Sequence, residues 1–505
     1  MSILDRFRSK PKPHQKRSTP QFIGSAERLK NSWYRNLVGN PNSTVRDSLT
    51  ESRKLSRVLC QTDVYAARWL ELMSVYVIGH QGFQFNPHVT NKDGSLNDTI
   101  NNELKRGWLE WTNFAAQDGK STFLDIEQTI IRQLARDGEI LVKIVVDTQV
   151  NKAGFALQIL DPALLDNEFN GMNGSNTIMN GIEYEPKYER AVAYYVWSGY
   201  MDDTMKVNRT RQRIPADEII HIYDDEYGTR RRGLPWLSPA IYQLARLHEF
   251  MDANLLACQV AAAAPLVLSS QQDDYADFNQ DDNVTNVKDT TDGSTTQNSG
   301  AQQQFINLDY TQILELSSGQ QLSALDIKFP NNQFGDVVKS YLRGIASALN
   351  MSYTALTSDS SDENYASGRL GSIYERDHWQ QIQFWLIRRF HQEVYRRWIQ
   401  VVINRNFITL PSSNGSDYFE VHWIPRGFRW VDPVKDANAY VTLLKEGIMT
   451  RTEITAERGG DWRNNIQILE QEQQFAVDHN VSLGEQPKTI TQQVAVLEQG
   501  ATTNG

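Results

Sequence analysis

Apolar residues recur along the chain with two spacings, which predict a mixture of helices and strands. Residues 44–79 follow a helical spacing, and their predicted apolar stripe consists of Leu55, Val58, Leu59, Val64, Ala67, Leu70 and Leu72. We interpret this stripe as the core-facing side of a helix that ends at Gly79. A second helix, IEQTIIRQLARDG, precedes four predicted strands: EILVKIVVDT, FALQILDP, AVAYYVW and EIIHIYD. The first half of the chain is therefore predicted to be α+β.

Helical spacing dominates the second half. One helix is predicted to begin with Ser238 as its N-cap and to continue through an alanine-rich stretch that Pro265 stops. Residues 334–349 carry a consistent apolar helical face. The longest helix is predicted at residues 369–404, where apolar residues recur every four positions: Ile382, Leu386, Phe390, Val394 and Trp398. Further helices are predicted from Pro433, followed by a frayed C-terminal end.

Two polar segments interrupt these helices. Residues 269–304 hold too little apolar surface to fold alone, so we interpret them as a mobile insertion. Two short strands and a turn are predicted directly after it, in FINLDYTQILELSSGQQ. The second polar segment, TSDSSDENYASG, separates two predicted helices, and its small, polar and partly acidic residues predict a loop that projects into water.

Composition restricts the class of protein. The 505 residues are 40% hydrophobic and 10% aromatic, which is enough for several folded regions. Cys60 and Cys258 offer neither a disulfide framework nor a thiolate metal site. No run approaches the roughly 18 apolar residues that would span a bilayer, and the basic N-terminal stretch lacks the apolar core of a signal peptide. The net charge of −10 argues against a protein that grips nucleic acid over its whole surface, although DNA could slide along an acidic or mixed wall.

The candidate catalytic motifs are incomplete. The GKS at residues 119–121 matches the end of a phosphate-binding loop, but Phe114 stands where that loop needs its first glycine. The HE at residues 248–249 begins a zinc motif, and the position of the second histidine is occupied by Asp252. No G-x-S-x-G sequence is present. We therefore predict no catalytic residue, no metal and no cofactor, and we expect a protein that is not an enzyme.

Charged clusters remain as candidates. One comprises Asp224, Asp225 and Glu226, and an arginine run at residues 230–232 follows it closely. A second acidic cluster comprises Asp359, Asp362 and Glu363, and we interpret both acidic clusters as solvated loops rather than divalent-ion sites. Phosphate binding competes with an ion pair or intersubunit contact for the arginines, and we favour the contact. The contact candidates are Arg230, Arg231, Arg232, Asp224 and Asp225.

Four segments, in this order, resemble the lambda-type family of phage portal proteins. The first is LQILDPALLDN with NGIEYEPKYERAVAYYVW, where a strand pair follows a D-P turn. The second and most specific is IPADEIIHIYDDEYGTRRRGLPWLSPAIYQLARLHEFMDANLLACQVAA, with its R-G-x-P-W-x-x-P turn. The third is NNQFGDVVKSYLRGIASALNMSYTALTSDSSDENYASGRLGSIYERDHW, and the fourth is DPVKDANAYVTLLKEGIMTRTEITAERGGDW. Together the blocks cover most of the chain from about residue 50 to 470.

The resemblance implies the portal fold, which has a mixed α/β wing, a helical stem, a small α/β clip and a helical crown, and which assembles into a ring, usually of twelve subunits. The implied division is a basic flexible arm at 1–24, the first part of the wing at 25–238, a stem helix at 239–264, a clip at 265–331 that contains the insertion, a second stem helix at 332–356, a tunnel loop at 357–368, the wing's long helix and strand at 369–432, and the crown with a frayed tail at 433–505.

In such proteins the tunnel loop approaches DNA. The DNA-facing candidates are Thr357, Ser358, Asp359, Ser360, Ser361, Asp362, Glu363, Asn364, Tyr365, Ala366 and Ser367. Because these residues include no basic side chain, we expect weak, nonspecific contact with DNA.

The implied function is that of a head-to-tail connector at one capsid vertex, the channel for packaging and ejecting double-stranded DNA. The implied partners are other copies of the chain, DNA, the terminase large subunit, the major capsid or scaffolding protein, and the head-completion or tail adaptor protein, with no membrane. Assembly is expected in the host cytoplasm, and the final location is the portal vertex of the virion. Two alternatives remain: another ring-forming connector, and a packaging ATPase, against which the broken phosphate loop argues.

Overall fold

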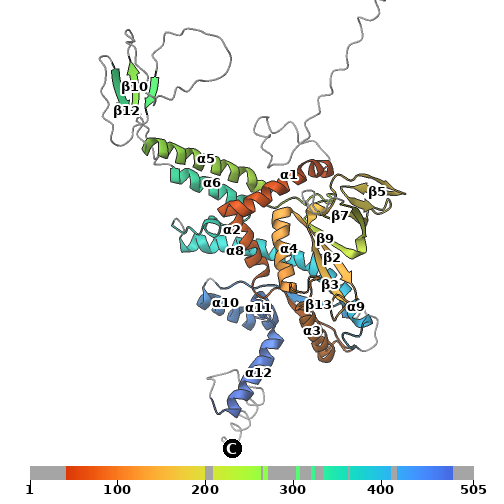
Figure 1. The fold of residues 1–505 in the computed structure, drawn as a ribbon. Helices are drawn as coiled ribbons and strands as arrows, with labels where there is room; N and C mark the ends of the chain where they lie inside the picture. Colours follow the sequence, from red (N-terminus) through yellow and green to blue (C-terminus); the bar gives the residue numbers. More distant parts are fainter. Residues whose placement is uncertain are drawn as a thin grey trace, which may run out of the picture. The chain divides into compact units, whose positions relative to one another are not determined.

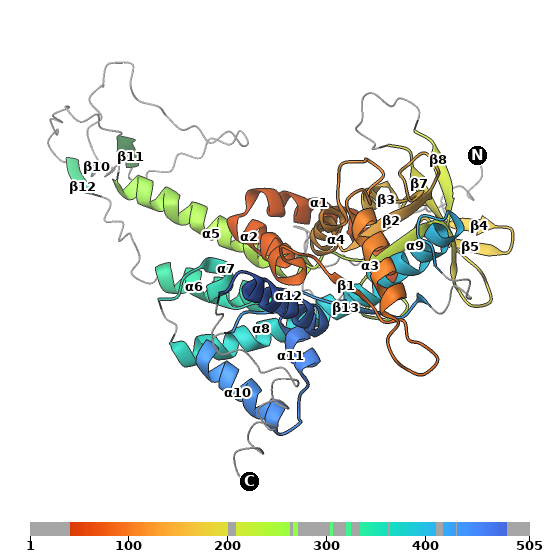
Figure 2. The ribbon, with the colours of Figure 1, turned by 90° about the horizontal axis from the view of Figure 1, so that it is seen from below.

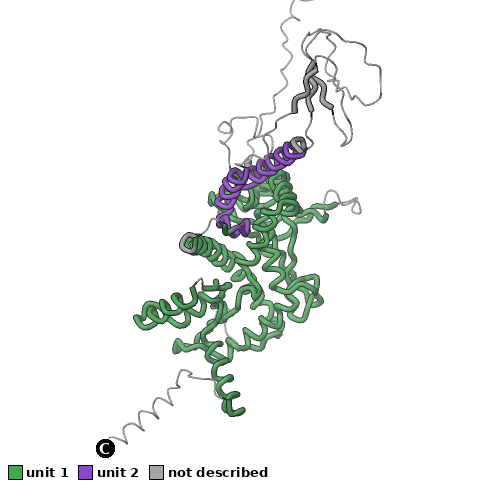
Figure 3. Tube along the Cα trace, turned by 90° about the vertical axis from the view of Figure 1, so that its left-hand side faces the viewer, with its two compact units in different colours: residues 1–238, 360–505 green, residues 239–359 purple. Residues whose placement is uncertain are grey.

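The structure, a computed structural model, describes residues 41–199, 209–262, 266–270, 303–306, 320–324, 334–361, 364–410, 418–430 and 432–481. It divides into two compact units, coloured separately in Figure 3: unit 1 is Met1–Ser238 with Ser360–Gly505, and unit 2 is Pro239–Asp359. The predicted N-terminal arm, most of the predicted insertion and the predicted frayed end lie outside the described residues.

Unit 1 combines helices with small antiparallel sheets (Figure 1). Its helical elements are α1 (Pro41–Thr62), α2 (Val64–Met73), η3 (Ser74–Ile78), α3 (Asp98–Thr112), α4 (Phe123–Asp137), η4 (Pro162–Leu164), η5 (Ala216–Glu218), α8 (Tyr365–Leu386), η6 (Ile387–His391), α9 (Gln392–Asn404), α10 (Pro433–Lys445), α11 (Arg451–Glu457) and α12 (Trp462–Asp478). Its strands are β1 (Gln84–Pro87), β2 (Glu139–Val146), β3 (Phe155–Leu160), β4 (Gly171–Asn173), β5 (Asn176–Met179), β6 (Ile182–Tyr184), β7 (Ala191–Trp197), β8 (Arg211–Pro215), β9 (Ile219–Tyr223) and β13 (Val421–Ile424).

These strands form sheets of order β3-β2-β9, β4-β5-β6-β7-β8 and β1-β13. The four strands predicted from the sequence are β2, β3, β7 and β9, and all four are confirmed. The pairing of β6 with β7 confirms a strand pair after the D-P turn. The α+β class is therefore confirmed.

Helix α4 and strand β2 form the centre of unit 1, and their junction is set by local sequence. Thr122 and Asp125 make a reciprocal capping box at the start of α4, and Gly138 ends the helix with a left-handed φ of 86°. Glu139 then opens β2, whose first four residues are all buried. Because α4 packs on β2 (Figure 1), the turn at Gly138 determines where the buried strand begins.

Aromatic side chains join segments that are far apart in sequence. Trp108 of α3 lies 5.0 Å, centroid to centroid, from Trp398 of α9 and 4.9 Å from Phe85 of β1. Helices α3 and α9 accordingly lie side by side in both Figure 1 and Figure 2. Gly107 of α3 lets Ile408, which follows α9, pack closely, because a Cβ at residue 107 would lie 2.3 Å from the Ile408 side chain. The residues around 85–123 and 390–424 therefore share one core.

The predicted stripe of residues 44–79 is wrong in part. Leu72 is buried and Gly79 ends the helical run, as predicted. Val58 and Val64 are 55% and 70% exposed, whereas the buried face of α1 includes Leu49, Arg53 and Ser56. The predicted single helix is also divided, since Asp63 accepts a hydrogen bond from the backbone N–H of Ala66 at 2.6 Å and caps a new helix, α2. The buried face carries polar side chains because they bond to the end of α4, as described below.

Unit 2 contains α5 (Ser238–Ala262, which begins at the unit boundary), β10 (Leu266–Ser270), β11 (Gln303–Ile306), β12 (Gln320–Ala324), α6 (Phe334–Ala348) and α7 (Tyr353–Thr357). The three strands form an antiparallel sheet of order β11-β10-β12. Strands β11 and β12 overlap only the two ends of the segment 305–321 in which two strands were predicted, and residues 307–319 lie outside the described residues, so that prediction stays a prediction. Residues 269, 270, 303 and 304, which were predicted to belong to the mobile insertion, lie in strands β10 and β11. Phe250 of α5 stacks on Phe334 of α6 with ring centroids 5.6 Å apart.

Ser238 is the first helical residue rather than the N-cap, and its hydroxyl oxygen is buried without a hydrogen-bond partner among the described residues. Pro265 lies outside the described residues.

Two predicted boundaries around the polar loop are wrong. The helix predicted at 332–356 ends at Ala348, and α7 follows a turn in which Asn350 has a φ of 53°. Thr357 is the last residue of α7, and α8 begins at Tyr365, four residues earlier than predicted. Tyr365, Ala366 and Ser367 are therefore helical, and the segment between the helices is residues 358–364.

The predicted long helix is confirmed with one modification. Its five apolar residues at every fourth position are all buried, and the turn at Ile387–His391 is π-helical. The helices predicted from Pro433 are also confirmed: Figure 2 shows α10, α11 and α12 in succession. Asp432, Thr450 and Asp461 cap them, and among their described residues only Ala476 is buried.

Candidate functional site

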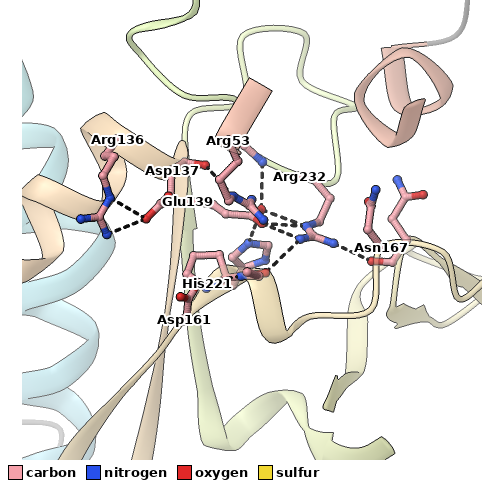
Figure 4. A network of polar contacts seen from close by, with 12 residues as sticks. Arg53, Arg136, Asp137, Glu139, Asp161, Asn167, His221 and Arg232 are labelled. Carbon is pink, nitrogen blue, oxygen red and sulfur yellow. Dashed lines mark hydrogen bonds and ion pairs between the residues drawn. The ribbon is translucent and has the colours of Figure 1, made fainter. Parts of the chain in front are cut away.

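The polar cluster shown in Figure 4 is centred on Glu139, the first residue of β2. Its carboxylate accepts hydrogen bonds from Arg232 Nη2 at 2.6 Å, Arg53 Nη2 at 2.9 Å and the backbone N–H of Gly233 at 3.0 Å. His221 of β9 lies 3.2 Å away through Nε2, which must carry the hydrogen because an ionised carboxylate only accepts. Four segments of unit 1 therefore meet at one buried carboxylate.

The electrostatics keep this cluster charged. Burial by itself raises the pKa of Glu139, but the charges of Arg232 and Arg53 and the hydrogen bond from His221 outweigh it and hold the pKa well below its usual range. Burial lowers the pKa of His221, and this effect exceeds the opposing effect of Glu139, so the ring is neutral at neutral pH. The positive charges opposite Glu139 are therefore those of the two arginines.

A second buried carboxylate lies at the end of α4. Asp137 accepts from Arg57 Nε at 2.6 Å and from Arg136 Nη2 at 2.9 Å, and Arg57 also bonds to Asp161 at 2.6 Å. The hydroxyl of Ser56 donates to the backbone carbonyl of Arg136 at 2.6 Å. These contacts explain why the buried face of α1 is polar: it covers the end of α4 and the start of β2.

The structure places the three arginines of the run differently. Arg232 is fully buried in the Glu139 cluster, and it also donates from Nη1 to the carbonyl of Asn180 at 2.9 Å. Arg231 pairs with Glu189. These contacts are within one chain, whereas the predicted contact between subunits stays a prediction.

Arg230 is likewise held within the chain, by the acidic cluster that precedes it. It donates to the carbonyl of Asp224 at 2.6 Å, and its backbone N–H donates to the carboxylate of Asp225 at 3.0 Å. Each of these two bonds uses a backbone group, so they close a local loop, and neither is the predicted ion pair between side chains.

Gly233, the glycine of the R-G-x-P-W turn, lies where the neighbouring backbone leaves no room for a side chain. A Cβ on Gly233 would lie 2.0 Å from the carbonyl oxygen of Gly138, and one on Gly138 would lie 2.1 Å from the carbonyl carbon of Leu234. The two backbones therefore cross in direct contact beside Glu139.

Sequence reasoning identified Arg232 but missed Glu139, Arg53 and His221. The available signal was an acidic residue that opens a largely apolar strand, EILVKIVV, since a buried carboxylate requires a cation.

The polar segment at 358–364 differs from the buried cluster because its residues are mostly exposed. Ser358, Ser360, Ser361 and Asn364 are exposed, and Asp362 and Glu363 lie outside the described residues. Its first residues are ordered by α7: Ser358 has a left-handed φ of 61°, and its N–H donates to the carbonyl of Thr354 at 2.7 Å.

The candidate phosphate loop already contains an anion. Asp118 accepts from the backbone N–H groups of Lys120 and Ser121 at 2.8 and 2.9 Å, and these bonds lower the pKa of Asp118 to about 2. The turn follows helix α3, as predicted, and borders a cavity of about 380 Å³ that Asp118 and Asp125 line. The N–H groups that would bind a phosphate are thus engaged by a carboxylate.

The described residues contain no group of three or more His, Cys, Asp or Glu side chains placed to hold a metal ion. Among the same residues, no helix has the length and apolar character needed to cross a membrane.

The described sites belong to an α+β fold in which buried charged groups hold separate segments together. The family model of phage portal protein, lambda family, matches residues 26–383. The chain therefore belongs to the lambda family of phage portal proteins. This is a structural family of head-to-tail connectors, so a packaging ATPase is not favoured.

Two phage portal proteins are similar to most of the chain. A probable portal protein of Halomonas phage phiHAP-1 is 28% identical over 437 residues, covering 85% of this chain and 80% of the relative. Portal protein B of Escherichia phage lambda is 21% identical over 378 residues, covering 70% of each chain. A solved structure, the neck of an empty gene transfer agent particle, is 13% identical with a TM-score of 0.42, covering 80% of this chain and 93% of that chain.

Proposed function

We propose that copies of this chain form a closed ring at one capsid vertex, and that double-stranded DNA is packaged and ejected through its channel. The observation that carries the proposal is the family match, whose bounds run from residue 26 to residue 383 and so include unit 2, the 358–364 segment and most of α8. The structural finding that supports it is the use of buried charges for packing, because a wall protein needs rigidity and no reactive group. We place the ring in the virion, assembled in the host cytoplasm.

The division into regions follows the observed elements. Helices α5 and α6 form the stem, the sheet of β10, β11 and β12 belongs to the clip, and α10 to α12 form the crown. Unit 1 without its C-terminal helices is the wing. The clip docks the terminase large subunit during packaging and an adaptor protein afterwards, while the capsid or scaffolding protein surrounds the ring.

Residues 358–364 form the loop that faces DNA. Exposed serines and the absence of Lys and Arg at 358–364 support this role, because phosphate affinity depends on cations and a conduit must release DNA continually. Tyr365, Ala366 and Ser367 belong to the first turn of α8, so they follow the loop and are not part of it.

Removing the loop tests this assignment. Deletion of residues 358–363 should leave rings intact and reduce the amount of packaged or retained DNA, whereas a Ser360→Gly, Ser361→Gly variant of unchanged length should package normally. Ring formation is measured by electron microscopy and packaging by nuclease-protected DNA. Loss of rings on deletion would identify the segment as a structural joint instead.

The absence of enzymatic activity has its own test. Purified protein should hydrolyse ATP no faster than an Asp118→Asn variant, because a carboxylate already occupies the backbone N–H groups of the candidate loop. Turnover that exceeds background in a phosphate-release assay would contradict the connector assignment.

A further inference from the structure

Tyr353 is the first residue of α7, and its hydroxyl makes a hydrogen bond to the first part of the loop. Its hydroxyl donates to Asp359 Oδ2 at 2.9 Å, across the end of α7. The hydroxyl of Thr357 donates to the carbonyl of Tyr353 at 2.8 Å, and the N–H of Asp359 in turn donates to Thr357 Oγ1 at 3.2 Å. Tyr353, Thr357 and Asp359 thus form a closed circuit, which we call the loop bracket.

The bracket flanks a residue in the left-handed conformation, whose N–H also donates to the carbonyl of Thr354 at 2.7 Å. Ser358 has a φ of 61°, and this left-handed conformation is unfavourable for a residue with a Cβ. Leu356, which is buried, anchors the preceding turn of α7. The bonds on both sides of Ser358 therefore offset local strain and fix the direction in which the chain leaves the helix.

The neighbouring charges favour the hydrogen-bonded state. The guanidinium of Arg343 on α6 lies over the ring of Tyr353, 5.6 Å from its centroid. Burial raises the pKa of Tyr353, and the bond to Asp359 raises it further, so the hydroxyl keeps its hydrogen and donates. A hydrogen bond from a neutral donor to an ionised carboxylate is one of the stronger kinds in proteins.

We propose that Tyr353 is a positioning residue for DNA transit: through Asp359 it fixes the root of the loop, so that the residues from Ser360 onward reach the channel from one fixed direction. This inference rests on the proposed function for its consequence and on the bracket for its geometry. Loss of the bracket would let the loop adopt many directions, and the ring would then hold DNA less uniformly.

The test uses Tyr353→Phe, which removes one hydroxyl and keeps the ring packed. Its matched control is Tyr440→Phe, which removes the same kind of bond, from Tyr440 to Glu457 Oε2 at 2.7 Å, in the C-terminal helices. In assembled rings, hydrogen exchange at the amides of Ser358 and Asp359 should accelerate about tenfold in Tyr353→Phe, because a bond to a charged group contributes on the order of that factor. The control should leave exchange at these amides unchanged.

Asp359→Ala removes the other partner. It should reproduce the effect of Tyr353→Phe, and the double variant should exchange no faster than either single variant, since both remove the same bond. Particles built with Tyr353→Phe should retain less nuclease-protected DNA than particles built with Tyr440→Phe.

Unchanged exchange in Tyr353→Phe would overturn the bracket. Accelerated exchange with normal DNA retention would overturn the positioning role, because the loop would then be loosened without consequence. Deletion of residues 358–363 separates these outcomes from failure of the proposed function: if the deletion also retains DNA normally, the loop itself does not act on DNA.

Discussion

Arg232 and Glu139 form a bidentate ion pair with no exposure to solvent on either side chain. Arg232 Nη2 lies 2.6 Å from Oε1, and Nε lies within 3.0 Å of both carboxylate oxygens. The two residues are 93 positions apart, so the pair fixes the segment after β9 to the start of β2. A carboxylate and a guanidinium in this position are costly to separate, because either one alone would be an uncompensated buried charge.

Glu139→Gln should therefore destabilise unit 1 by about 3 to 5 kcal/mol. Glu71→Gln is the matched control, since Glu71 pairs with Arg132 at 2.9 Å and both side chains are exposed to water. That variant should cost at most about 1 kcal/mol. Urea denaturation followed by tryptophan fluorescence measures both changes in the free energy of unfolding, and equal effects would show that the buried cluster is not a stabilising centre.

The same cluster predicts a loss of stability in acid. The pKa of Glu139 is lowered in the fold, so its contribution is present above its unfolded value of 4.5 and is lost as the pH falls through its folded value. The pKa of His221 is also lowered from 6.5, so protonation favours the unfolded chain as the pH falls below 6.5. The free energy of unfolding should accordingly decline below pH 6.5 and more steeply below 4.5.

His221→Gln isolates the first part of this decline, because glutamine keeps a donor for Glu139 but does not titrate. The difference in the free energy of unfolding between the two proteins should change below pH 6.5 and stay constant above it. A difference that does not vary with pH would show that His221 does not titrate with folding.

Gly138 and Gly119 provide a comparison between strain and steric overlap. Both have a left-handed φ, 86° and 67°, but a Cβ would meet the backbone of Leu234 at the first position and nothing within 4 Å at the second. Gly119→Ala should cost about 1 to 2 kcal/mol from backbone strain alone. Gly138→Ala should cost about 2 to 5 kcal/mol, because overpacking adds to that strain. Equal melting temperatures for the two variants would contradict the observed crossing of the backbones.

The spacing of apolar residues predicted the long helix and its buried residues but not its π-helical turn. Apolar residues at every fourth position drift by about 160° around a regular α-helix over four steps, so the pattern from Ile382 to Trp398 does not fit one straight face. The π-helical turn at Ile387–His391 adds a residue to one turn and returns the pattern to the core, so that all five side chains are buried. The exact period of four was thus a signal for this turn that helix prediction alone did not use.

Apolar periodicity alone did not reveal the buried ion cluster. A pattern of apolar residues treats Arg53 and Ser56 as solvent-facing. Only their bonds to Glu139, 86 positions away, and to the carbonyl of Arg136, 80 positions away, place them inside. The loop boundaries were missed for a related reason. Ala366, Ser367 and Gly368 are small residues that are common in loops, so composition did not mark the start of α8.

The central claim is that this chain closes into a ring with a channel for DNA, and electron microscopy of the purified full-length protein tests it most directly. The account predicts closed rings, usually of twelve subunits, with a central opening wide enough for duplex DNA. Monomers that persist at high protein concentration, or closed particles without an opening, would contradict it.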